Sequence, residues 1–145
     1  MRSSLPLEIE PLALTKRGAT LQGTLALEQM TRLHDLITKT AGDVDVKLSF
    51  DQGKFLPPCV SGRIQTTLMV ECVRCGQAFE YKVDLQPNLR IVRNDEQAKN
   101  LEGQQEPLLL EEDTVNLVKL VEDEILLSLP MLIRHEDSEC RKEIG

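Results

Sequence analysis

The sequence predicts an α+β fold: one domain over residues 1–145, with an antiparallel β-sheet, one helix early in the chain and one helix late. Apolar and polar side chains alternate over 44–50 and 60–72, as they do in strands with one buried face. Apolar side chains recur every three or four positions over 28–38 and over the stretch that ends at Leu129, as on one face of a helix. A chain of 145 residues, 41% of them hydrophobic, is long enough to bury one core.

The N-terminal half is expected to contain three strands and one helix. Residues 5–14 favour a strand at a sheet edge, because their two prolines cannot donate to a central ladder. Leucines at even spacing indicate a second strand over 19–27, and the alternation of apolar with polar residues makes 44–50 the clearest strand of the chain. Between these strands, apolar residues three and four positions apart predict a helix over 28–38, with Gly42 just beyond its end.

A β-hairpin is predicted for the middle of the chain. Residues 60–72 and 78–85 both alternate between apolar and polar side chains, and a Cys-x-x-Cys-Gly turn lies between them. Cys72 falls on the apolar side of the alternation and Cys75 lies in the turn, so both cysteines are expected at the tip of the hairpin. Residues 89–92 predict one more short strand.

The C-terminal half begins with a polar stretch and continues with a helix. Residues 94–107 contain almost no apolar side chains and are interpreted as a solvated loop. A helix is expected to start at Asp113 or Thr114, either of which can cap its first turn, and to run to about Leu129. Pro130 cannot continue the helix and therefore marks its end.

The composition bounds the classes of function. The chain has 17 Lys and Arg, 24 Asp and Glu and a net charge of −7, whereas a phosphate-binding surface needs concentrated basic residues. With 3% aromatic residues it also offers few rings on which single-stranded bases could stack. RNA contact by this chain is therefore not favoured. The first residues do not form a secretory signal and no apolar run has the length of a membrane span, so we expect a cytoplasmic protein without membrane contact.

Three cysteines and a histidine form a candidate zinc site. Cys72 and Cys75 supply one pair of ligands on a tight turn, for which Gly76 provides the permissive backbone. His135 and Cys140 would supply a looser second pair where the chain leaves the last helix. Such a Cys₃His set fills all four tetrahedral positions, so the zinc ion would be structural rather than catalytic.

Two other interpretations of Cys72 and Cys75 stay open. The two thiols could act as a redox pair or form a disulfide, although a hairpin lacks the strand-to-helix setting of a thioredoxin-like site. They could also be plain thiols near a turn. Disulfides are uncommon in the cytoplasm, and cysteine pairs there more often bind metal or carry thiol chemistry.

Glu122, Asp123 and Glu124, consecutive in the predicted last helix, form a second candidate site. At about 100° per residue their side chains spread around the helix and do not converge as a pair of catalytic carboxylates does. They form either a solvated face or a surface that binds a basic partner. The sequence has no Gly-rich phosphate loop, no Ser/His/Asp arrangement and only two histidines for acid–base chemistry, so we do not expect an enzyme.

Several of these features recur together in one known family. They are Gly62 ahead of the hairpin, the Cys-x-Arg-Cys turn that ends at Cys75, the run VEDEILLSLP that ends at Pro130, and His135 and Cys140 after it. In this combination the chain resembles the YceD family, the large ribosomal RNA subunit accumulation proteins of bacteria, which have plastid relatives in plants. The resemblance implies a non-enzymatic factor in the synthesis, processing or stability of 23S ribosomal RNA. Some relatives have cysteine where His135 stands here, an exchange that a zinc ligand tolerates.

The same resemblance implies partners among ribosome assembly or rRNA-processing proteins. A mechanism consistent with it is that zinc ties the hairpin to the last helix and so presents the carboxylates of residues 122–124 to a basic protein. The alternative is direct RNA binding through a local basic patch on the polar face of the hairpin, formed by Arg63, Arg74, Lys82 and Arg90.

Overall fold

The structure is a computed structural model that describes residues 5–53, 57–101 and 106–130, and within these residues its main feature is a six-stranded sheet. The strand order is β2-β3-β4-β6-β7, with β5 also paired to β4. All strand pairs of this sheet are antiparallel except β6 and β7, which run parallel. The strands are β2 (Thr20–Ala26), β3 (Asp43–Asp51), β4 (Cys59–Glu71), β5 (Ala78–Leu85), β6 (Asn88–Val92) and β7 (Glu106–Leu109).

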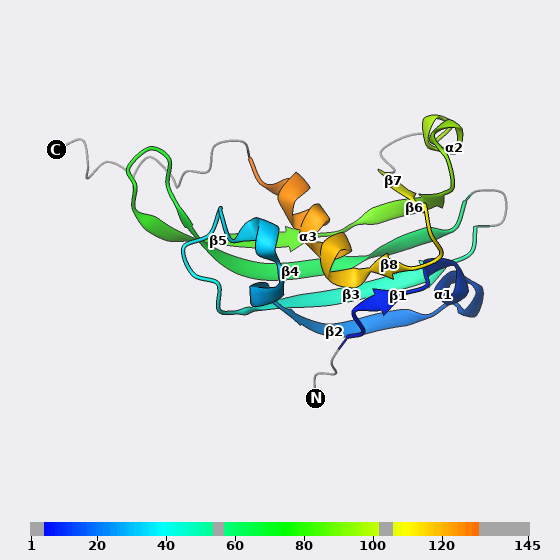
Figure 1. Ribbon diagram of the computed structural model, residues 1–145, viewed down its shortest axis with the longest axis horizontal. Coiled ribbons are helices and arrows are strands. Elements are labelled where there is room, and N and C mark those ends of the chain that lie inside the picture. The colour runs from blue at the N-terminus through cyan, green and yellow to red at the C-terminus, as the bar shows by residue number, and fades with distance from the viewer. Residues whose placement is uncertain (1–4, 54–56, 102–105, 131–145) are drawn as a thin grey trace.

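Shorter elements cover one face of this sheet. Helix α3 (Leu117–Ser128) lies across the face, next to the 3-10 turns η1 (Leu27–Gln29) and η2 (Thr31–Leu33) (Figure 1). A small antiparallel sheet of β1 (Glu8–Ile9) and β8 (Val115–Asn116) leads into α3. The remaining helices are α1 (Pro11–Arg17) and α2 (Asp95–Lys99). The mixed content and the mostly antiparallel sheet confirm the predicted α+β class.

Strand β4 is long enough to pair with two strands along one side. Its first residues pair with β6 and its later residues with β5, in the same register, so β5 and β6 follow one another beside β4. The interruption between them contains Pro87, which has no N–H for the ladder, while its carbonyl accepts from the N–H of Gly62 at 3.3 Å. The predicted hairpin over 60–72 and 78–85 and the predicted short strand over 89–92 are therefore confirmed.

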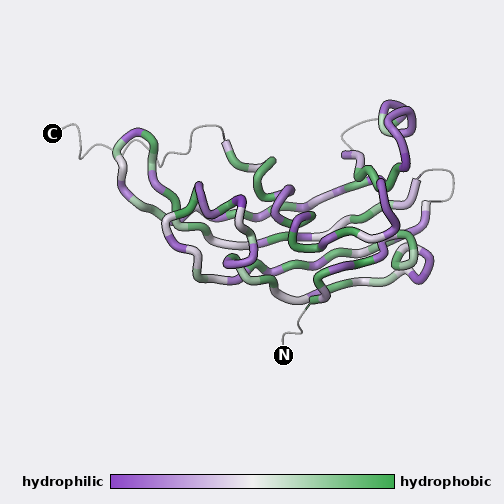
Figure 2. Tube along the Cα trace, in the orientation of Figure 1, coloured by the Kyte–Doolittle hydropathy of each residue, from purple (hydrophilic) through white to green (hydrophobic). Residues whose placement is uncertain are grey.

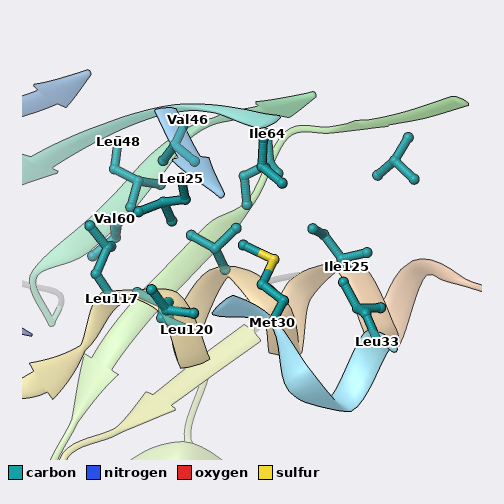
Figure 3. Packing of buried hydrophobic residues seen from close by; sticks show 14 of the residues in the cluster. Leu25, Met30, Leu33, Val46, Leu48, Val60, Ile64, Leu117, Leu120 and Ile125 are labelled. Atoms are coloured by element: carbon teal, nitrogen blue, oxygen red, sulfur yellow. The ribbon is translucent and has the colours of Figure 1, made fainter. Parts of the chain in front are cut away.

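The core lies between the sheet and the elements that cover it. On β3, Val44, Val46, Leu48 and Phe50 are at most 2% exposed, while the intervening residues face solvent. Figure 2 shows this alternation of hydrophobic and hydrophilic residues along the strands. Figure 3 shows the buried side chains meeting between sheet, η turns and helix, among them Leu25, Met30, Leu33, Val46, Leu48, Val60, Ile64, Leu117, Leu120 and Ile125. Burial of this aliphatic surface is the main stabilising contribution to the fold.

The strand predicted over residues 5–14 is mostly wrong. Within this range only Glu8 and Ile9 form a strand, and α1 begins at Pro11. Proline is well tolerated at the first helical position, because the N–H that it lacks would have no partner there. The helix ends at Gly18, whose φ of 60° is the left-handed conformation of a common helix stop. The strand predicted over 19–27 is confirmed as β2.

The helix predicted over 28–38 is also wrong as a regular α-helix. The segment forms η1 and η2 and then an isolated bridge between Ile37 and Val70. The apolar positions were nevertheless informative, because Met30, Leu33 and Ile37 are buried. Hydrogen bonds to Glu122 of α3 and the bridge to Val70 of β4 hold the backbone in this conformation.

In the described part of the stretch over 94–107, which excludes 102–105, the structure has regular elements in place of the predicted loop. It contains α2, whose first turn is capped by the side chain of Asn94, and the first residues of the parallel strand β7. Helix α3 begins later than predicted, with Asn116 as its cap: the backbone N–H of Lys119 donates to the Asn116 side chain at 3.0 Å. The end of the predicted helix agrees with the structure to within one residue.

Candidate functional site

Cys72 and Cys75 lie on a closed turn at the tip of the β4–β5 hairpin. The N–H of Cys72 donates to the carbonyl of Gln77 at 2.9 Å, and the N–H of Gly76 donates to the carbonyl of Cys72 at 2.8 Å. Gly76 has φ of 77°, a conformation that side chains disfavour. Cys72 is 1% exposed and Cys75 is half-buried. The prediction that Cys72 lies with the apolar side chains is confirmed.

This turn fits one half of a tetrahedral zinc site. Two cysteines three positions apart on a tight turn are a usual ligand pair for zinc. His135 and Cys140 lie outside the described residues, so the four-ligand site stays a prediction. Within residues 5–53, 57–101 and 106–130, no group of three or more His, Cys, Asp or Glu side chains is close enough to hold a metal ion. For a redox role, the burial of Cys72 is unfavourable, because an attacking thiolate needs access to its substrate.

Glu122 is an internal residue that holds the η2 turn against α3. It is 3% exposed. Its Oε2 accepts from the backbone N–H groups of Arg32 at 2.8 Å and Leu33 at 3.1 Å, and its Oε1 accepts from Nε of Arg32 at 3.2 Å. The carboxylate thus caps the first turn of η2 from another element, the role that an N-cap side chain has in most helices. The residues that donate these bonds, Arg32 and Leu33, belong to a 3-10 turn and not to the α-helix predicted over 28–38.

The three carboxylates of the predicted partner surface therefore have different surroundings. Glu122 faces the interior and does not lie on the surface that the sequence suggested. Asp123 is half exposed and pairs with the Arg32 guanidinium, whose pKa is raised first by the hydrogen bond to Asp123 and then by that to Glu122. No local pattern pointed to Arg32, because 90 residues separate it from Glu122 in the chain.

Glu124 lies beside Glu106 of β7. The sequence indicated Glu124 as a site residue but not Glu106. Partial burial, together with the hydrogen bond and the negative charge of Glu106, raises the pKa of Glu124 from its ordinary 4.5 to about 8, with a further contribution from the charge of Asp123. In the described part of the chain, neither Glu106 nor Glu124 forms a salt bridge. Glu124 therefore keeps its proton near neutral pH.

This carboxyl pair is expected to make stability fall as pH rises. The folded state binds the proton more tightly than the unfolded chain, so the Glu124 contribution is complete below about pH 4.5 and is lost as pH rises through about 8. Melting temperatures measured between about pH 5 and about pH 8.5 should fall less for Glu124→Gln than for the unmodified protein. Glu80→Gln, at an exposed position on β5, should leave the pH profile unchanged. Parallel profiles for Glu124→Gln and the unmodified protein would contradict the pairing.

An apolar groove runs between α3 and β7 next to this pair. It includes a hollow of about 410 Å³ whose lining comes from both elements, from Leu89 and from Arg32. Leu127 on its helix side is 72% exposed, the largest exposure of any large hydrophobic residue in the described chain. Most of the lining is aliphatic, and Glu106, Asp123 and Glu124 supply its acidic groups.

The basic side chains proposed for RNA contact are largely engaged within the molecule. Arg63 forms a bidentate ion pair with Asp84 on the outer face of the sheet, with N–O distances of 2.8 and 2.7 Å. The guanidinium in turn lowers the pKa of the Asp84 carboxyl. Arg90 donates through Nη1 to the carbonyl of Pro57 at 2.7 Å. Arg74 and Lys82 are exposed. Because Arg63 and Arg90 are engaged in the contacts just described, the four residues do not form an uncompensated basic patch.

None of the helices in the described residues combines the length and apolar character needed to cross a lipid bilayer.

Comparison with known proteins decides the family. Residues 60–144, more than half of the chain, match the family model described as large ribosomal RNA subunit accumulation protein YceD. The chain belongs to the YceD family. The matched range begins near the start of β4 and includes the Cys72–Cys75 turn, all of α3 and every lining residue of the groove hollow except Arg32. The resemblance seen in the sequence motifs is therefore confirmed.

A curated YceD-family relative agrees with this assignment over a longer range. The large ribosomal RNA subunit accumulation protein YceD of Haemophilus influenzae is 30% identical over 139 residues, which cover 94% of this chain and 79% of the relative. The similarity thus extends to the N-terminal strands that the family model does not match. No solved structure matches the chain.

Proposed function

We propose that this YceD-family protein is a non-enzymatic cytoplasmic factor for the accumulation of 23S ribosomal RNA, acting mainly through contacts with ribosome assembly or rRNA-processing proteins. The observation that carries the proposal is the relative named for large ribosomal RNA subunit accumulation, which matches 94% of this chain. Its role would lie in the synthesis, processing or stability of that RNA.

Three features support protein contacts over RNA contacts. The net charge of −7 opposes a phosphate backbone, and the ion pair of Arg63 with Asp84 reduces the positive potential on the outer sheet face. The exposed apolar groove beside α3, with its acidic groups, is instead suited to a basic protein. His34 is the histidine of the described residues. Its Nε2 lies 3.3 Å from the carbonyl oxygen of Leu27, so the ring lies against the backbone.

The proposal includes a structural zinc ion held by Cys72, Cys75, His135 and Cys140. Zinc bound there would connect the hairpin tip to the segment that follows α3, and its binding free energy would add to the stability of the fold. The purified protein is expected to contain about one zinc ion per chain. Elemental analysis by mass spectrometry should show this content strongly reduced in the Cys72→Ser/Cys75→Ser variant.

A matched control is available in Cys59, which is half-buried on β4 and lies outside the predicted ligand set. Cys59→Ser is expected to keep the full zinc content. Absence of zinc from the unmodified protein, purified without chelator, would contradict the metal site and leave Cys72 as a buried thiol of the core.

The function is tested by the ratio of 23S to 16S RNA in cells that lack this protein. The ratio is expected to fall, and expression of the unmodified chain should restore it. The Cys72→Ser/Cys75→Ser variant should not restore it if the hairpin tip is required, whereas Cys59→Ser should. An unchanged ratio in the deletion strain would show that this family member does not support 23S RNA accumulation.

A further inference from the structure

The groove between α3 and β7 has the features of a docking site that nothing covers in the described chain. Its helix side carries Leu127, and its floor includes Leu89, Leu108 and Leu120. The hollow of about 410 Å³ adjoins a second of about 470 Å³, because both are lined by Leu108, Leu120 and Asp123. Exposed aliphatic surface of this kind is costly in water and is typical of surfaces that bind a partner.

The charge of the groove indicates the chemistry of its partner. Five carboxylates and two cations of the described chain line the two hollows. One of the cations, Arg32, is already paired with Asp123 and Glu122. Among the described residues, no cation pairs with Glu106 or Glu124, which leaves two carboxyl groups with acceptor capacity at the edge of an aliphatic floor.

We propose that this groove binds a basic polypeptide segment, in which a lysine or arginine lies between Glu106 and Glu124 and neighbouring aliphatic side chains pack on Leu108, Leu120 and Leu127. A cation there would make charge-assisted hydrogen bonds to both carboxylates. The aliphatic side chains would cover Leu127, which is 72% exposed, and removal of this apolar surface from water favours binding. An RNA strand does not fit this site, because its phosphates would meet the same carboxylates.

This inference deepens the proposed function, since it names the surface and the kind of protein segment through which the factor would act. It also changes the candidate partner surface from residues 122–124 of α3 to Glu124 together with Glu106. Glu122 is used internally, while Glu124 joins Glu106 of β7, so the binding carboxylates come from two elements. The sequence run from Val121 to Pro130 then contributes both Glu124 and the exposed Leu127 to one groove.

A second property of the site follows from the proton that the carboxyl pair holds. The groups that face Glu124 are Glu106 from β7, Asp123 from α3 and Arg32 from η2, which is itself paired. With the pKa of Glu124 raised to about 8, a bound cation would displace this proton. Binding should therefore tighten as the pH rises toward about 8, since a proton is released on binding.

The test is a display selection of random peptides against the full chain, with the Glu106→Gln/Glu124→Gln variant as counter-target. Enriched peptides are expected to carry lysine or arginine beside leucine, isoleucine, valine or methionine. Their affinity for the variant should be about tenfold lower, which corresponds to about 1.4 kcal/mol. Leu127→Ala should weaken the same peptides, and Glu71→Gln/Glu80→Gln, at exposed positions of β4 and β5, should not.

Several outcomes would overturn the docking proposal. No enrichment, enrichment of acidic peptides, or equal binding to the Glu106→Gln/Glu124→Gln variant would each do so. Enriched peptides that match residues 131–145 would show that a segment of the same chain occupies the groove, and peptides that match another part of this chain would indicate a second copy. If the selection fails while deletion of the protein lowers the ratio of 23S to 16S RNA, only the docking site is wrong. If peptides bind as expected while the ratio is unchanged, only the proposed function is wrong.

Discussion

Replacement of Glu122 by alanine is expected to lower the free energy of unfolding by about 3 to 5 kcal/mol. The substitution leaves the part-buried N–H of Arg32 and the buried N–H of Leu33 without the acceptor that lies 2.8 and 3.1 Å away in the native protein. Each unsatisfied buried donor costs about 1 to 3 kcal/mol. The side chain is also packed against η2, so its removal leaves a cavity beside the core. Urea unfolding followed by circular dichroism measures the change.

Two matched variants separate the capping role of Glu122 from a general effect of charge. Glu122→Gln keeps the shape and one acceptor oxygen, so its loss should be smaller than that of Glu122→Ala. Asp123→Asn changes the charge of the next residue, which is half exposed, and should change stability much less than either. If Glu122→Ala and Asp123→Asn lose similar amounts of stability, the interior carboxylate is not the main connection between α3 and η2.

Replacement of Gly62 by alanine is expected to destabilise the sheet by about 3 kcal/mol or more, beyond the usual range for an added methylene. A Cβ at this position would lie 1.8 Å from the backbone oxygen of Lys47 and 3.0 Å from Cα of Leu48 on β3. Those atoms belong to the partner strand, which pairs Leu48 with Gly62 in the centre of the sheet. The contact can be relieved only by separating two central strands, so the thermal unfolding midpoint should fall steeply.

Two other substitutions provide controls for Gly62→Ala. Ser61 directly precedes Gly62 on β4 and is exposed. Ser61→Ala should therefore change the free energy of unfolding by no more than about 0.5 kcal/mol. Gly18→Ala tests backbone conformation instead of space, because Gly18 has φ of 60° and no atom lies within 4 Å of its added Cβ. Its cost should be about 1 to 2 kcal/mol. A Gly62→Ala protein as stable as Ser61→Ala would mean that β3 and β4 are further apart than described.

The candidate sites were only partly predictable from the sequence. Cys72 and Cys75 could be placed at a hairpin tip because both flanking strands alternate and the turn residues lie between them. Glu124 was found as one of three consecutive carboxylates, but its partner Glu106 lies 18 positions away in a stretch that looked like a solvated loop. Pairing between two negative groups has no local pattern, and only the packing of α3 on β7 brings them together.

The sequence by itself determined the elements whose signal is local. Alternation with a period of two identified β2, β3, β4 and β5, and the helical spacing together with Pro130 identified most of α3. The tertiary structure alone decided that two 3-10 turns and a bridge replace the helix predicted over 28–38, that residues from Glu106 onward add a parallel strand, and that Glu122 is internal. The physical reason is the separation, along the chain, of the residues that interact. A periodic pattern reports which face of a segment is buried. These three outcomes depend instead on pairing between residues about 17 to 90 positions apart, which becomes available only when the sheet and α3 have come together.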